Sequence, residues 1–217
     1  MLVSQSIVKI ERHTTYYAGS ATGHMVNYGT GVIVGVERVN HHQEYLLLSN
    51  EHVAKNHHIT GKRLSTLSIV AGNGVREPIL LETVAIDPRR DVALLRTVNC
   101  PGNLKLPDWV LGSPPEGIRR AIAFTEGYGN GVFSTLEGEI VSTKAVDWSL
   151  KCVRIDVPVA GGQSGAPLVV IGADRRLYLV ALVFCGTEHY TDATPLFPGQ
   201  GVLRQLTSLV DRHIAGY

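Results

Sequence analysis

One serine in the second half of the chain lies among glycines, directly ahead of an apolar stretch. Ser164 follows Gly161, Gly162 and Gln163, and Gly165 comes next. Glycines beside a serine let the backbone turn sharply, so that successive N–H groups converge on one point. Such a loop suits acyl transfer, in which a hydroxyl attacks a carbonyl carbon and N–H groups stabilise the oxyanion. The sequence therefore predicts Ser164 as a nucleophile, with the N–H groups of Gly162 and Ser164 as the oxyanion hole.

A serine hydroxyl attacks at neutral pH only when a base takes its proton, and the usual base, an imidazole, needs a carboxylate to orient it. His52 follows the apolar run 46–48, and Asp91 directly precedes the apolar run 92–95. Either residue alone is most simply a loop or turn residue. The chain order His, Asp, Ser belongs to two-barrel serine proteases. We therefore predict His52, Asp91 and Ser164 as a catalytic triad.

Three other patterns are weaker indications of a functional site. The histidine pairs at 41–42 and 57–58 lack a carboxylate or cysteine pattern at zinc-ligand spacing, so we expect no metal site. The glycine-rich run 127–131 lacks the Lys-Ser/Thr of a phosphate-binding loop and is expected to be a β-turn. Cys185 lacks the glycine context of Ser164, and is expected to be a core or cleft-wall thiol. No cofactor is expected.

Short runs rich in Val, Ile and Leu recur along the chain, bounded mostly by Gly, Pro, Asn or Asp. This spacing favours short strands in a β-barrel or sandwich. The predicted strands cover residues 30–36, 45–49, 67–70, 79–86, 92–97, 120–124, 138–141, 153–157, 166–171 and 177–184.

A segment rich in proline and glycine, residues 99–117, divides the chain into two β-rich halves. We predict an N-terminal barrel over about residues 1–98 and a C-terminal barrel with a helix over about 118–217. A cleft between the two halves would bring His52 and Asp91 to Ser164. The predicted C-terminal helix shows apolar residues at helical spacing. They are Val202, Leu206, Leu209, Val210 and Ile214.

The composition is that of a globular protein. Of the 217 residues, 44% are hydrophobic and 18% are charged, which argues against disorder. The net charge of +1 provides no broad field for nucleic acid or an anionic membrane, so neither is expected as a partner. The first residues show no secretory signal pattern, and three cysteines are too few for a disulfide framework. We expect a cytoplasmic protein.

Several segments resemble trypsin-like serine proteases, and most closely the bacterial heat-shock (HtrA/Deg) protease domain. The resemblance covers most of the chain. It is carried by GTGVIV at 29–34, SNEHV at 49–53, VAIDPRRDVALL at 84–95, LEGEIVS at 136–142 and GQSG at 162–165. It implies an all-β fold of two packed antiparallel β-barrels with a C-terminal helix. It also implies a serine endopeptidase acting on a protein or peptide substrate, and no PDZ domain is expected after the terminal helix.

The resemblance also implies a specificity pocket. In the family, the position six before the nucleophile forms the base of this pocket, and here it is Pro158, which carries no charge. The pocket wall and substrate-pairing strand correspond to Val183, Phe184, Cys185 and Gly186. We therefore expect cleavage after small or medium apolar residues such as Ala, Val or Leu. A carboxylate of Asp192 turned into the pocket would instead favour a basic residue.

Two departures from the family leave alternatives open. Gln163 stands where secreted trypsins have Asp and heat-shock proteases usually have Asn, so no ion pair with a newly cut N-terminus can form. Ala166 replaces a family glycine. One alternative is a catalytically silent peptide-binding or scaffold module that uses the same cleft. Another is a protease that a partner or peptide activates by ordering the oxyanion loop, whose double glycine at 161–162 favours mobility. The intact triad favours an active or activatable endopeptidase.

Overall fold

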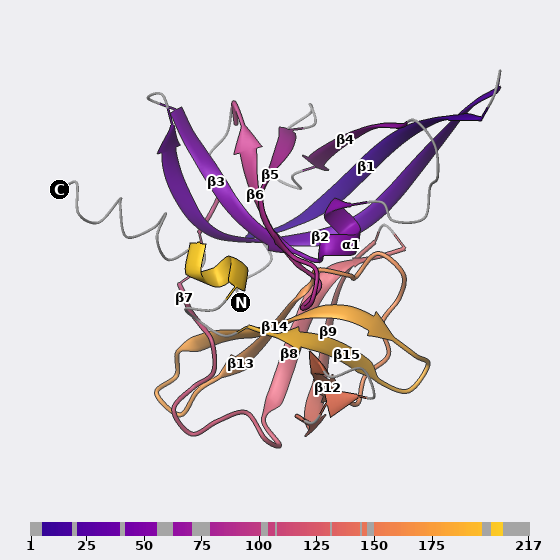
Figure 1. Ribbon diagram of the computed structural model, residues 1–217. Helices are drawn as coiled ribbons and strands as arrows, with labels where there is room; N and C mark the ends of the chain where they lie inside the picture. Colours follow the sequence, from indigo (N-terminus) through magenta and orange to yellow (C-terminus); the bar gives the residue numbers. More distant parts are fainter. Residues whose placement is uncertain are drawn as a thin grey trace.

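The structure is a computed structural model. It describes residues 6–18, 21–39, 42–55, 63–70, 79–100, 104–106, 108–130, 132–143, 145–146, 150–196 and 201–205. Within these ranges the chain is built almost wholly from strands, which form two units lying one above the other (Figure 1).

The first unit is a closed barrel of six strands in the order β1-β2-β3-β6-β5-β4, with every neighbouring pair antiparallel. The strands are β1 (Ile7–Ala18), β2 (Ala21–Val39), β3 (His42–Ser49), β4 (Arg63–Val70), β5 (Ile79–Asp87) and β6 (Val92–Val98). A one-turn helix, α1 (Glu51–Ala54), follows β3.

The unbroken apolar runs of β3 and β6 follow from burial on both faces. Successive residues of a strand point to opposite faces of the sheet. Leu47 and Leu95 point into the core of the first barrel. Leu46, Leu48 and Leu94 point the other way and join a second core that includes residues of the C-terminal half. These two strands therefore bind the barrels together, and beside the predicted site β3 ends and β6 begins.

The second unit is a seven-stranded sheet in the order β13-β8-β9-β12-β15-β14-β7, which a further β13–β14 pairing closes on itself. Its strands are β7 (Trp109–Leu111), β8 (Ile122–Gly129), β9 (Val132–Ser142), β12 (Val153–Ile155), β13 (Pro167–Ile171), β14 (Leu177–Gly186) and β15 (Thr191–Pro195). Two short strands, β10 (Ala145–Val146) and β11 (Leu150–Lys151), pair separately. Among the strands of the described ranges, only β7 pairs in parallel, with β14.

These barrels confirm the predicted all-β fold, and Figure 1 shows a short helical segment beside the junction of the barrels. Residues 201–205 are helical, and Val202 and Leu203 are buried in the core between the barrels. The remaining predicted helix positions, Leu206, Leu209, Val210 and Ile214, lie outside the described residues. No helix in the described ranges is long and apolar enough to cross a membrane.

The sequence did not predict several elements. β1, β7, β10, β11 and β15 were missed, as was helix α1. β15 has the sequence TDATP, whose Asp and Pro are rare in strands. It forms because both neighbouring strands, β12 and β14, hydrogen-bond to it, and Ala193 packs into the second barrel's core.

Candidate active site

His52 lies on helix α1, which an arginine of strand β1 holds in place. The last carbonyls of a helix lack partners within the helix. Arg12, on β1 and buried, donates from Nη1 to the carbonyl of His52 at 3.0 Å and to that of Val53 at 2.6 Å. The backbone that carries the imidazole is therefore fixed by charge-assisted hydrogen bonds.

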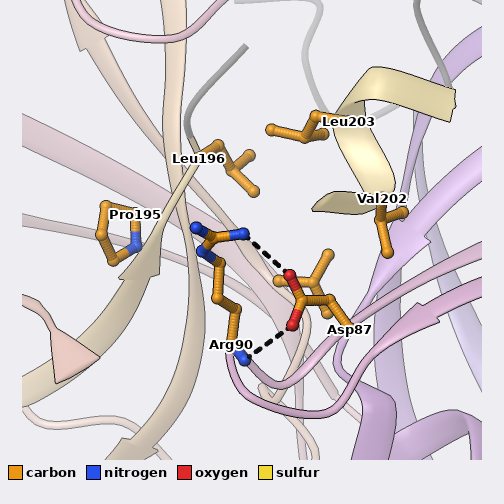
Figure 2. A pocket seen from close by; sticks show the side chains of 7 residues that line it. Asp87, Arg90, Pro195, Leu196, Val202 and Leu203 are labelled. Atoms are coloured by element: carbon orange, nitrogen blue, oxygen red, sulfur yellow. Dashed lines mark hydrogen bonds and ion pairs between the residues drawn. The ribbon is translucent and has the colours of Figure 1, made fainter. Parts of the chain in front are cut away.

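Asp91 ends the tight turn between β5 and β6. Its φ is 53°, in the left-handed region that Asp tolerates better than most residues. The turn is closed by Asp87, whose carboxylate accepts from Arg90 Nη1 at 2.9 Å (Figure 2). This ion pair lines a small pocket between the barrels, together with the apolar residues Val92, Pro195, Leu196, Val202 and Leu203. The turn is thus packed against the second barrel and the helical segment.

The structure brings His52 and Asp91 into contact through two hydrogen bonds. Nδ1 of His52 lies 2.7 Å from Oδ2 of Asp91, and the backbone N–H of His52 donates to Oδ1 at 2.9 Å. Because a carboxylate only accepts, Nδ1 donates, and in the neutral imidazole Nε2 is then the nitrogen with the lone pair. Asn50, fully buried, donates from Nδ2 to the Asp91 carbonyl at 2.9 Å and fixes the aspartate backbone as well.

Two consecutive turns shape the loop that carries Ser164. The N–H of Gln163 donates to Ala160 at 3.2 Å, and the N–H of Ala166 donates to Gln163 at 2.8 Å. The third residue of each turn is a glycine with positive φ, +95° at Gly162 and +87° at Gly165. This is the pattern of a type II turn, in which that position favours glycine. Ser164 therefore lies at the corner of a tightly folded backbone.

The first barrel holds this loop through Thr30, which is fully buried on β2. Its N–H donates to the carbonyl of Ser164 at 2.8 Å, and its Oγ1 donates to that of Gly162 at 2.9 Å. The hydroxyl of Ser49, three residues before His52, donates to the Thr30 carbonyl at 2.7 Å. A side chain at Gly165 would collide with that carbonyl and with the Ser49 hydroxyl. The nucleophile loop therefore packs against the end of the strand that leads to His52.

The peptide between Gly161 and Gly162 has a defined direction. Its carbonyl accepts a hydrogen bond of 2.6 Å from the N–H of Asn130. In a trans peptide the N–H points opposite to the carbonyl, so the N–H of Gly162 points away from Asn130. Within the described residues, neither this N–H nor that of Ser164 donates to a protein acceptor. Two backbone donors beside the serine hydroxyl are thus unused.

Among the described residues, Ser164 makes its side-chain hydrogen bond to a backbone carbonyl and not to the histidine. Its Oγ lies 3.5 Å from the carbonyl oxygen of Phe184 and donates to it, and no hydrogen bond in the described ranges joins it to His52. The structure thus joins His52 to Asp91, and Ser164 to Phe184.

The predicted pocket wall lies beside the serine loop. Gly165 donates to the carbonyl of Val183 at 2.8 Å, and the N–H of Val183 donates to Ala166 at 2.9 Å. Pro158, the predicted base, is exposed. The next residue, Val159, has its Cγ2 directly against the backbone of Gly186, where an added Cβ would collide with it.

Asp192 is engaged by Arg154 on the neighbouring strand. Its two carboxylate oxygens accept from Arg154 Nε at 2.7 Å and Nη2 at 2.9 Å, and its side chain is buried. The guanidinium also lies 3.7 Å from the centre of the Tyr190 ring. The hydrogen bonds to Asp192 raise the pKa of Arg154 above its ordinary value, so the guanidinium stays charged. The carboxylate is therefore neutralised within the β12–β15 pair.

Cys185 has the properties of an unreactive thiol. The residue is exposed, so it is not a core thiol. Partial desolvation of its sulfur nevertheless raises the pKa of Cys185, and the nearby Asp192 carboxylate raises it further. A thiol with a raised pKa is a poor nucleophile at neutral pH. Among the described residues no group of three His, Cys, Asp or Glu side chains is placed to hold a metal ion.

Sequence reasoning missed four residues that position the site: Arg12, Thr30, Asn50 and Asn130. Thr30 had a visible signal, because it stands between Gly29 and Gly31. The other three act through contacts between residues at least 31 positions apart, for example Asn130 with Gly161. No local pattern reports such contacts.

Comparison with known proteins agrees with this fold. The family described as trypsin-like peptidase domain matches residues 29–177. No curated protein matches the chain. The active form of the Rv3671c protease from M. tuberculosis superposes with a TM-score of 0.64 at 21% identity, covering 95% of this chain and 82% of that one. The HtrA-type protease AlgW with a decapeptide gives a TM-score of 0.67 at 17% identity, covering 97% of this chain and 66% of that one. The chain belongs to the trypsin-like peptidase domain family.

Proposed function

We propose that the protein is a serine endopeptidase in which Ser164 is the nucleophile, His52 the general base and then acid, and Asp91 the group that orients His52. The observation that carries the proposal is the doubly hydrogen-bonded contact between Asp91 and His52. It leaves Nε2 of His52 able to accept a proton, which is what an attacking serine requires. A module that only bound peptides would have no use for this arrangement.

The reaction follows from these positions. When a peptide enters, the Ser164 hydroxyl leaves the Phe184 carbonyl and turns to Nε2 of His52, as catalytic hydrogen bonds often form only with substrate bound. Nε2 takes the hydroxyl proton as Oγ bonds to the carbonyl carbon. The oxyanion accepts from the N–H groups of Gly162 and Ser164. The C–N bond then breaks, and the leaving amine takes the proton from His52. Water then attacks the acyl carbon as His52 takes one of its protons, the bond from that carbon to Ser164 Oγ breaks and frees the acid, and His52 returns the proton to Oγ.

The substrate class is an extended peptide with a small apolar residue before the scissile bond. The structure of the HtrA-type protease AlgW contains a decapeptide. In this chain the exposed end of β14 offers an edge to which an extended peptide can add as a further strand. Val159 narrows the space beside Gly186, and Thr191 is fully buried with its hydroxyl bonded to the Val157 carbonyl. Because Arg154 neutralises Asp192, no free carboxylate is left to attract a basic side chain.

We expect kcat/KM to rank Ala and Val above Leu, and all three well above Arg and Lys, on internally quenched peptides that differ only at that residue. Replacing Val159 with Gly removes the side chain that fills the space beside Gly186 and should shift the preference toward Leu and Phe by about tenfold, a typical effect of one to two carbon groups in a pocket. Val157→Ala is the matched control, because Val157 lies two residues away and packs against the barrel core. A preference for Arg or Lys in the wild-type protein would contradict the neutral pocket.

A further inference from the structure

The β8–β9 hairpin holds the oxyanion turn at two points. The first is the N–H of Asn130 at the hairpin tip, which binds the Gly161 carbonyl at 2.6 Å. The second is Ser134 on β9, whose Oγ accepts from Nε2 of Gln163 at 2.9 Å. Gly129, the residue before Asn130, lies so close to the turn that an added Cβ would be 3.0 Å from the Cβ of Ala160. The hairpin and the turn are therefore in direct contact.

The side chain of Gln163 fastens the turn from inside. It is 1% exposed, and its Oε1 accepts from the N–H of Ala160 at 2.9 Å. The backbone N–H of Gln163 donates to the carbonyl of the same alanine at 3.2 Å. Both polar groups of Ala160 are thus satisfied by one residue. Because the N–H of Ala160 needs an acceptor, Oε1 must face it, and the amide nitrogen must face Ser134.

We infer that Gln163 and Ser134 are a positioning pair that keeps the oxyanion turn ready for substrate in the unliganded chain, so that the protease needs no activating partner or new N-terminus. This inference rests on the proposed function. The pair acts on the direction of the Gly161–Gly162 peptide. A reversed peptide would turn the Gly162 N–H toward the hairpin, and would break the bond from Asn130. Gln163 holds Ala160, and the N–H of Asn130 holds the carbonyl of Gly161. These contacts oppose reversal of the Gly161–Gly162 peptide.

Three substitutions separate this role from general stability. Gln163→Met keeps the length and burial of the side chain but removes both hydrogen bonds. Ser134→Ala removes only the link to the hairpin, and Ser134→Thr keeps the hydroxyl. Thr135→Ala is the matched control, because Thr135 is the next residue of β9 and its hydroxyl bonds Glu126 instead of the turn.

The kinetic test measures kcat and KM separately for each variant on one peptide substrate and compares how much each constant changes. We expect kcat to fall about 10- to 100-fold in Gln163→Met and about 3- to 10-fold in Ser134→Ala, with KM changed less than about twofold, because the oxyanion donors act in the transition state. Ser134→Thr and Thr135→Ala should stay within about twofold of the wild type. The double variant Gln163→Met/Ser134→Ala should be no slower than Gln163→Met, since the pair acts as one unit. A rise in KM at constant kcat would overturn the inference.

Hydrogen exchange supplies a readout that does not depend on activity. In the unliganded wild-type protein the amides of Ala160 and Asn130 should be protected, and in Gln163→Met they should exchange at least about tenfold faster, because each opening breaks both contacts. Unprotected amides in the wild type would overturn the inference even if the protein proves to be an active protease. If the amides are protected but the protein never hydrolyses a peptide, the proposed function is contradicted, while the ordered oxyanion turn is supported.

Discussion

Replacing Asp91 with Asn is expected to lower kcat about 10⁴-fold, the loss typical of a triad whose carboxylate becomes an amide. Two donors of His52, the backbone N–H and the Nδ1–H, face the two oxygens of Asp91. An amide has only one oxygen, so one donor must face an N–H₂ group. The imidazole then moves its proton to Nε2, which can no longer accept from Ser164.

The backbone should tolerate this change. Asp91 has a φ of 53°, and Asn populates the left-handed region readily. The matched control is Asp87→Asn, four residues earlier in the same turn, where the carboxylate binds Arg90 and not His52. Steady-state kinetics on one peptide, with circular dichroism to verify folding, compare the two variants. Equal losses in both would assign the effect to the turn and contradict the role of Asp91.

Replacing Gly162 with Ala is expected to lower kcat about 10²- to 10³-fold with little change in KM, the cost of losing one oxyanion donor. Gly162 has a φ of +95°, and an added Cβ would lie 2.5 Å from the carbonyl oxygen of Tyr128. That carbonyl belongs to a strand and cannot move aside, so the turn must change instead. The N–H of Gly162 then leaves the position where an oxyanion forms.

Gly117→Ala is the control for backbone strain. Gly117 has a similar φ of +83°, but an added Cβ there would have no atom within 4 Å. Both variants therefore carry a left-handed alanine, and only one carries a collision beside Ser164. If Gly162→Ala hydrolyses the peptide as fast as Gly117→Ala does, the N–H of Gly162 has no part in the reaction.

The sequence predicted the fold class and most strands because apolar runs bounded by turn residues are a local signal. The runs at 45–49 and 92–97 fall within β3 and β6. β15 escaped because its strand state depends on two partners remote in sequence, and not on the residues TDATP. β2 extends from Ala21, nine residues before the predicted start, because it pairs with β1 along its whole outer part.

In the candidate site, too, local patterns were predictable and contacts between remote residues were not. His52, Asp91 and Ser164 were chosen from local patterns, and the structure places the first two in contact. The direction and ionic partner of the Asp192 side chain could not be predicted from the sequence, because Arg154, which binds it, lies 38 residues earlier. The role of Gln163 was equally hidden. Its departure from the family pattern was visible, but its bond to Ser134 spans 29 residues and depends on how the hairpin packs.

The most direct test of the proposed protease is the site of labelling by a fluorophosphonate, which reacts only with an activated serine. Intact mass and peptide mapping of the wild-type protein should show one adduct, on Ser164. Ser164→Ala should carry none, and Asp91→Asn should react far more slowly. An unlabelled wild-type protein, or an adduct that persists in Ser164→Ala, would contradict the assignment of Ser164 as the nucleophile.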